Sequence, residues 1–149
     1  MIKNQIGRSI VRLRGIRPWH SMGNEMQISR SFLVIGSLYL LLGILIGMYM
    51  GGSGDHSLAP LHAHINLLGF ALMTVFGIIY RIIPAMAGTT LAKAHFWLHQ
   101  IGALILLVML WLLFSGKITE AAMAPLAPIA ELMVLLGTGT FAFNLWKST

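Results

Sequence analysis

The sequence predicts an all-α membrane protein, with four transmembrane helices in an up-down bundle and both termini in the cytoplasm. Three observations predict this class. The 149 residues are 57% hydrophobic and only 9% charged, which is unlike the composition of a soluble domain. Four apolar stretches each approach the roughly 20 residues that a helix needs to cross a bilayer. Most of the Lys and Arg residues lie in the segments predicted on one side of the membrane.

Residues 1–30 are predicted to form a basic cytoplasmic segment that precedes a transmembrane domain over residues 31–149. Ile6, Ile10 and Leu13 share one helical face, and the arginines lie on another, which is the pattern of a short interfacial helix on anionic lipid. A basic tail without helical structure fits the same residues equally well. We expect no cleavable signal, because the charged region is too long and the apolar run after it is long enough to span a bilayer.

The four predicted spans cover residues 31–50, 58–80, 94–114 and 121–146. The short loops between them make sequence neighbours antiparallel. Arg81 and Lys93 flank the middle loop and Lys147 follows the last span, whereas only Lys117 falls in a loop of the other set. The positive-inside rule therefore predicts an N-in, C-in chain in a bacterial-type inner (cytoplasmic) membrane.

Composition also limits the function classes. The net charge of +6 comes from the same Lys and Arg bias, so orientation and contact with membrane lipids explain it and no nucleic-acid partner is predicted. The chain has no cysteine. Thiolate metal sites, iron–sulfur clusters and covalent haem attachment through cysteine are therefore excluded.

Two histidines, His62 and His64, lie near the outer start of the second span, where an ionisable side chain is costly and usually has a function. A helix turns by about 100° per residue, so imidazoles at i and i+2 point to opposite sides and do not chelate one ion. This spacing is typical of a helix that stands between two sites. His56, in the outer loop, is a further candidate, whereas a solvated side chain explains His20.

His95 and His99 begin the third span from the inner side and share one helical face. We expect His95 to be exposed at the membrane surface and His99 to hydrogen-bond a neighbouring helix, with a metal-binding pair as the other interpretation. Helical rise separates His99 from His64 by roughly 20 Å of depth, so the two should not ligate one group within a chain. Glu131 should lie near the depth of the outer pair, as a hydrogen-bond partner of an imidazole, a proton-transfer group or a solvated side chain in an outer vestibule.

Imidazole is the commonest protein ligand for haem iron and for copper or zinc. A haem b between helices would bury its ring among apolar side chains and leave its propionates near the surface. Gly69, just over a turn after His64, is expected to leave room for a ring edge. Gly36, Gly43, Gly47 and Gly51 form a ridge on the first span that lets a helix or a flat cofactor come close.

The stretch HAHINLLGFALMTVFGIIYRIIP, followed by HFWLHQIG, resembles the second and third helices of the catalytic subunit of haem–copper oxygen reductases and nitric oxide reductases. The shared features are His-x-Asn, Gly-x-x-Tyr, a proline and Phe-Trp, here His64, Asn66, Gly77, Tyr80, Pro84, Phe96 and Trp97. Haem- and copper-containing membrane proteins associated with denitrification carry similar helices. The resemblance implies that His64 ligates a low-spin haem from the outer side, next to Asn66, and that a His-x-His helix gives one histidine to each of two haems.

That catalytic subunit has three four-helix arcs with pseudo-threefold symmetry, whereas this chain has four spans and no second set of copper-binding histidines. The leading hypothesis is therefore a small relative of it, a cytochrome b with bis-histidine haem ligation that exchanges electrons with a redox partner or senses a gas. One alternative is an outer-face copper- or zinc-binding or haem-trafficking module built from His56, His62, His64 and Glu131. A second alternative is a minimal nitric oxide or oxygen reductase, so enzymatic activity stays open.

The divergence of His62 and His64 also predicts self-assembly. A six-coordinate haem needs two imidazoles converging on one iron, so the second ligand should come from another copy. A two-fold dimer pairs like with like and leaves one histidine type unused. In a cyclic trimer, His62 of one chain faces His64 of the next, and every histidine of the pair is used. A homotrimer is therefore favoured over a dimer, and its three copies match the three arcs of the family that the chain resembles.

Overall fold

The computed structural model describes residues 19–149, and within them the chain is helical with no strand. Four helices are long and apolar enough to cross a membrane, over Gln27–Ser53, Ala59–Ile82, Thr90–Phe114 and Leu126–Ser148. These helices confirm the all-α class and the character of a multi-pass membrane protein. The expectation of an interfacial helix before Pro18 lies outside the described residues.

The spans are built from helices of very different length. The first is α2 (Trp19–Ser53), which continues through Arg30 without a break. The second span has three consecutive parts, α3 (Ala59–His64), the π-helix η1 (Ile65–Ala71) and α4 (Leu72–Ile82). The short helix α5 (Pro84–Ala87) leads into α6 (Thr90–Phe114), and the 3-10 turn η2 (Glu120–Met123) precedes α7 (Leu126–Ser148).

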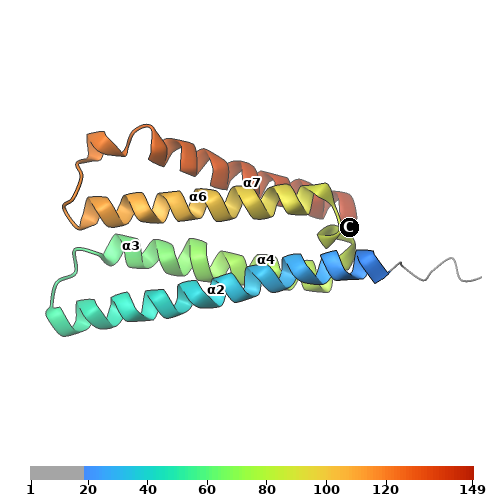
Figure 1. Cartoon of the computed structure of the whole chain (residues 1–149), viewed down its shortest axis with the longest axis horizontal. Coiled ribbons are helices and arrows are strands. Elements are labelled where there is room, and N and C mark those ends of the chain that lie inside the picture. Colours follow the sequence, from blue (N-terminus) through green and yellow to red (C-terminus); the bar gives the residue numbers. More distant parts are fainter. Residues whose placement is uncertain (1–18) are drawn as a thin grey trace, which may run out of the picture.

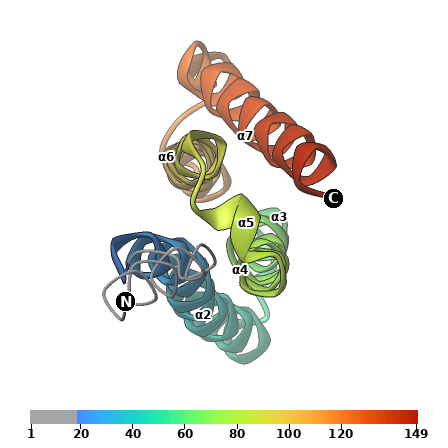
Figure 2. The ribbon, with the colours of Figure 1, turned by 90° about the vertical axis from the view of Figure 1, so that its right-hand side faces the viewer.

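Figure 1 shows the chain passing back and forth along the long axis of the molecule. We call the end where α2 begins and α7 ends the terminal end, and the opposite end, where α2 ends and α3 begins, the loop end. Viewed along the axis in Figure 2, the helices follow one another in a staggered row, with α2 and α7 at its two ends. Within the described residues α2 and α7 do not touch, whereas α2 packs along the second span and α6 along α7. The two end helices of the row, α2 and α7, are therefore free of each other.

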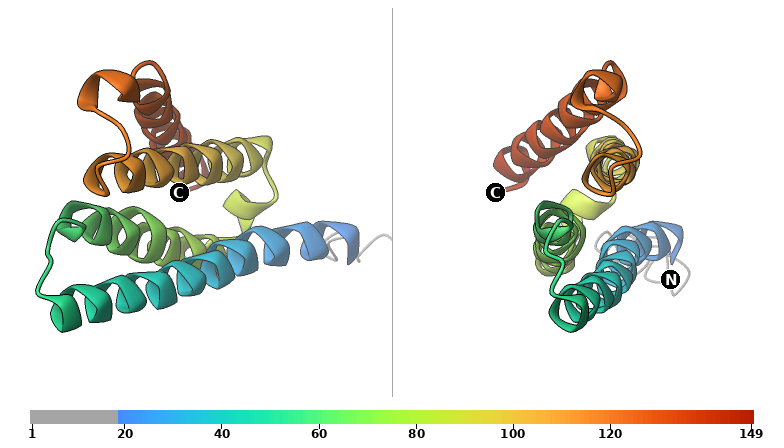
Figure 3. Two further views of the ribbon diagram at one scale, coloured as in Figure 1. Left: turned by 60° about the vertical axis from the view of Figure 1, so that its left-hand side comes forward. Right: turned by 90° about the vertical axis from the view of Figure 1, so that its left-hand side faces the viewer.

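The helix α5 joins the two halves of the row, the α2–α4 pair and the α6–α7 pair. It contacts α2, α4, α6 and α7, and Figure 3 shows it between the α2–α4 pair and the α6–α7 pair. Its Met86 and Ala87 are fully buried. At the terminal end α5 therefore covers the space between the second and third spans.

Glycines set the closest helix approaches. A Cβ added to Gly102 on α6 would lie 2.9 Å from the carbonyl oxygen of Ala130 on α7. On α2, a Cβ at Gly36 would meet the carbonyl oxygens of Gly69 and Phe70 at 3.5 Å. This part of the predicted glycine ridge packs against a helix, as small residues in membrane helices commonly do.

Replacing Gly102 with Val tests the close approach of α6 and α7. The added side chain has backbone and Cβ atoms within 3.0 Å, so we expect a loss of about 1–3 kcal/mol of stability from overpacking. Gly139→Val is the matched control, because a Cβ there has no neighbour within 4 Å. The measurement is the midpoint of thermal unfolding in detergent. Equal midpoints for the two variants would contradict this packing.

Candidate functional site

His62 is half-buried against α2, and α2 determines its tautomer. Its Nδ1 lies 2.9 Å from the carbonyl oxygen of Gly43. A carbonyl only accepts hydrogen bonds, so Nδ1 carries the proton and Nε2 carries the lone pair. Gly47 makes room for the ring, because a Cβ there would lie 3.1 Å from Cε1 of His62.

His64 has the same tautomer for a different reason. Its Nδ1 donates a hydrogen bond of 2.7 Å to the carbonyl oxygen of Pro60, one turn earlier in the same helix. Its Nε2 is therefore the lone-pair nitrogen. Because α3 is a regular α-helix over both histidines, the bonds from their backbones diverge by about 200°.

Asn66 lies directly on His62. Its Nδ2 donates to the carbonyl oxygen of His62 at 2.8 Å and lies 3.3 Å from His62 Nε2. The amide fills the notch left by Gly43, where a Cβ would come within 2.6 Å of Asn66 Oδ1. A ligand that binds His62 Nε2 must displace this long contact, so His64 offers the more accessible nitrogen.

Gly69 does not leave the open space that the sequence led us to expect. A Cβ at this position would lie 2.5 Å from Cγ of Tyr39, so the ring of Tyr39 on α2 occupies the room beside it. The glycine allows close packing of α2 on η1. Room for the edge of a cofactor beside Gly69 is therefore not found.

The two remaining candidates, His56 and Glu131, are exposed. His56 is exposed in the loop after α2, with Nδ1 3.0 Å from the carbonyl oxygen of Gly54. Next to it, a hydrogen bond from the backbone N–H of Ser57 lowers the pKa of the Asp55 carboxyl. Glu131 is exposed on α7. Among the described residues no three His, Cys, Asp or Glu side chains gather to hold a metal ion, so His56, His62, His64 and Glu131 are not brought to one metal within the chain.

A second site, which the sequence reasoning underrated, lies toward the terminal end. His95 and His99 on α6 are both 0% exposed. The expected exposure of His95 is therefore wrong. The helix α6 begins at Thr90, four residues before the predicted span, with Thr89 as its cap accepting from the N–H of Ala92 at 3.1 Å. This earlier start puts His95 more than a turn inside the helix, where the other helices cover it.

The two buried imidazoles each make one hydrogen bond to the second span. The hydroxyl of Tyr80 lies 2.9 Å from His95 Nδ1. His99 Nε2 lies 3.1 Å from the carbonyl oxygen of Leu68, which confirms the expected bond from His99 to a neighbouring helix. We call Tyr80, His95 and His99 the imidazole cluster.

The π-helix η1 explains why Leu68 can accept this bond. In an α-helix its carbonyl would receive the N–H of Leu72, but that N–H donates to Leu67, five residues earlier. The wider turn thus leaves the Leu68 carbonyl without that α-helical donor. The carbonyl is then available to His99 on the next helix.

Phenylalanine rings from three helices surround the imidazole cluster. Phe32 of α2 stacks on His95 with 5.0 Å between ring centroids, and Phe76 of α4 meets His95 edge-on at 4.4 Å. Phe141 of α7 lies 5.1 Å from His95. Within this apolar shell, His95 Nε2 and His99 Nδ1 have no hydrogen-bond partner among the described residues. In the sequence, the i, i+4 pairs His95–His99 and Phe76–Tyr80 indicate one helix face on each of two spans, and these two faces pack against each other.

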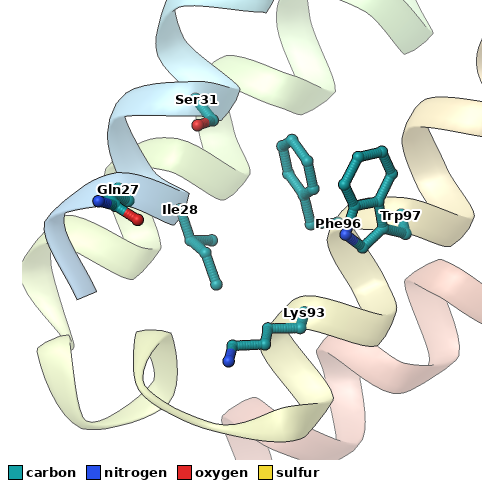
Figure 4. Close-up of a pocket in the computed structure, with 6 residues that line it drawn as sticks. All are labelled: Gln27, Ile28, Ser31, Lys93, Phe96 and Trp97. Carbon is teal, nitrogen blue, oxygen red and sulfur yellow. The ribbon is translucent and has the colours of Figure 1, made fainter. Parts of the chain in front are cut away.

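A hollow at the terminal end has fewer reactive side chains than the two histidine pairs. Figure 4 shows Gln27, Ile28 and Ser31 of α2 facing Lys93, Phe96 and Trp97 of α6 around it. Of these six residues only Lys93 is charged, and none is an imidazole or a carboxylate. We assign no reaction to this hollow.

Comparisons with protein-family models, curated proteins and solved structures find no match to the chain. The geometry of its own residues therefore carries the functional argument.

Tyr80→Phe tests the hydrogen bond that holds His95. The substitution leaves His95 Nδ1 buried without a partner, which should cost about 1–3 kcal/mol of stability. Tyr49→Phe is the control, because Tyr49 is 55% exposed on α2. Thermal unfolding in detergent should show a lower midpoint for Tyr80→Phe alone. Indistinguishable midpoints would mean that the bond contributes nothing.

Proposed function

We propose that the chain is a cytochrome b of a bacterial-type inner membrane, which binds haem b through His64 and His62 and transfers electrons or responds to a bound gas. The single observation behind this proposal is the hydrogen bonding of the two rings. Each Nδ1 donates to a backbone carbonyl, so each Nε2 presents a lone pair. Metal-ligating histidines are oriented in this way, with the second nitrogen held by a carbonyl or carboxylate.

The surroundings of the pair fit a flat apolar cofactor better than a small metal ion. Haem needs one or two imidazoles and a largely apolar environment, and both histidines lie at the start of an apolar span. A structural copper or zinc site usually needs three or four ligands, which the described residues do not gather. When bound, haem would supply one-electron chemistry, and this chain would supply the axial nitrogens and their orientation.

The proposal includes assembly from several copies. His62 faces α2, and His64 projects from the other side of α3, so the two rings do not converge within one chain. A homotrimer with His62 of one chain and His64 of the next on each haem uses every ring. The staggered row is compatible with this assembly, because its end helices α2 and α7 do not contact each other. Glu131, exposed on α7, would then face lipid or a neighbouring copy, as a hydrogen-bond or proton-transfer partner.

Orientation follows the positive charges. We place both termini in the cytoplasm, because Lys and Arg concentrate before the first span, beside the middle loop and after the last span. A topology reporter fused after Thr149 should be active only on the cytoplasmic side, and one inserted after Lys117 only on the outer side. The reverse pattern would overturn the orientation.

His64→Ala should remove haem from the purified protein. We expect the haem content per chain to fall at least about tenfold, as for loss of a ligand-site group. His99→Ala should keep most of the haem, because the Leu68 carbonyl already occupies His99 Nε2. His56→Ala is the exposed-histidine control. The measurement is the visible spectrum with metal analysis. Loss of haem from His99→Ala alone would contradict the proposal.

The same spectra separate the alternatives. Sharp reduced bands of a six-coordinate b haem support the cytochrome, whereas a colourless protein loaded with copper or zinc supports a metal-binding or haem-trafficking module. Carbon monoxide binding to the reduced protein would favour a minimal nitric oxide or oxygen reductase. Native mass spectrometry should find a trimer with haem at its interfaces, and a haem-loaded monomer with a bis-histidine spectrum would refute shared ligation.

A further inference from the structure

We propose that Tyr80, His95 and His99 form a buried proton relay closed by one bound water molecule. The water accepts a hydrogen bond from His95 Nε2 and donates one to His99 Nδ1. This inference uses the imidazole cluster alone and does not rest on haem binding at the loop end. It follows from the protonation pattern of the two rings and from their burial.

The tautomer of His99 follows from its partner. The carbonyl of Leu68 can only accept, so His99 Nε2 carries the proton that lies in the 3.1 Å contact. A neutral imidazole has one proton. His99 Nδ1 is therefore a bare lone pair, with no partner among the described residues.

The tautomer of His95 follows from the phenol beside it. In the 2.9 Å contact with Tyr80, the better acceptor is the imidazole nitrogen, because a neutral imidazole takes up a proton near pH 6.5 whereas a neutral phenol only gives one up, near pH 10. The phenol therefore donates to His95 Nδ1. His95 then carries its own proton on Nε2, which is a bare N–H donor.

The two bare nitrogens are thus complementary, one a donor and the other an acceptor. Each is unfavourable if left unpaired in an apolar site. The rings do not bond each other directly, and their centroids lie 5.9 Å apart. One water joined to both nitrogens by hydrogen bonds of about 2.9 Å would satisfy both of them. A metal ion would need two lone pairs here, and the tautomers provide only one.

With the water in place, His95 and His99 each donate and accept, and Tyr80 donates to His95. A proton arriving at the Tyr80 oxygen lets the phenol pass its own proton to His95 Nδ1. His95 releases its Nε2 proton to the water, and the water passes a proton to His99 Nδ1. One proton enters at Tyr80 and one extra proton ends on His99, whose Nε2–H remains on the Leu68 carbonyl. No group is oxidised or reduced.

The relay has a direction. It starts at Tyr80, near the terminal end of α4, and it stops on His99 because a backbone carbonyl cannot take the proton further. Leu68 belongs to η1, the segment that directly follows His64. The relay therefore ends against the helix that carries the outer histidine pair.

Solid-state NMR of the ¹⁵N-histidine-labelled chain in lipid bilayers tests the relay. We expect His95 and His99 both to be protonated at Nε2, and water protons to transfer magnetisation to His95 Nε2 and His99 Nδ1. Signals are assigned from sequential backbone spectra of the unchanged protein, so no variant has to fold. A proton on His95 Nδ1, two lone pairs facing each other, or no transfer from water to either nitrogen would overturn the proposal.

Tyr80→Phe gives a second, independent readout on the same sample type. We expect the His95 Nδ1 signal to move to that of a free lone pair, while His99 and its water contact stay unchanged. Tyr49→Phe should leave both imidazoles as in the unchanged chain. If Tyr80→Phe leaves the His95 Nδ1 signal unchanged, the phenol is not the donor, and the assigned direction of the relay is wrong.

Discussion

The hydrogen bond from His99 to the Leu68 carbonyl is the contact on which the middle of the molecule depends. It joins the second and third spans, where the two halves of the row meet. It exists because η1 directs the Leu72 N–H to the Leu67 carbonyl. A polar side chain in an apolar span is stable only if it finds a partner. Here one helix supplies that partner by a local change in its own winding.

The same π turn keeps one side of the second span buried. Leu61, Ile65, Gly69 and Met73 recur every four residues, and all are buried. In an α-helix each four-residue step drifts by about 40° around the axis, so this row would leave the interface. The wider π turn takes up the drift. Gly69 lies within this turn, where the ring of Tyr39 needs the space of a missing side chain.

The sequence could predict what depends on hydropathy and on regular helical geometry. The four spans, the divergence of the bonds carrying His62 and His64, and the bond from His99 to another helix belong to this group. It could not predict the burial of His95, which depends on a helix start set by Thr89 and on phenylalanine rings from three other helices. Nor could it place Asn66, whose position is decided by the notch at Gly43 on another helix.

The two histidine pairs show how the same side chain acquires different chemistry. At the loop end each Nδ1 donates a hydrogen bond to a backbone carbonyl, both rings are half-buried, and the Asn66 amide lies 3.3 Å from Nε2 of His62. In the imidazole cluster the partners are a phenol and a carbonyl, and phenylalanine rings close off the remaining nitrogens. Ligation requires an accessible lone pair, whereas proton transfer requires a shielded chain of alternating donors and acceptors. The helix α2 borders both pairs, with Gly43 and Gly47 on His62 and Phe32 on His95. A shift of α2 along the second span would therefore alter ligand orientation at one end and shielding at the other at the same time.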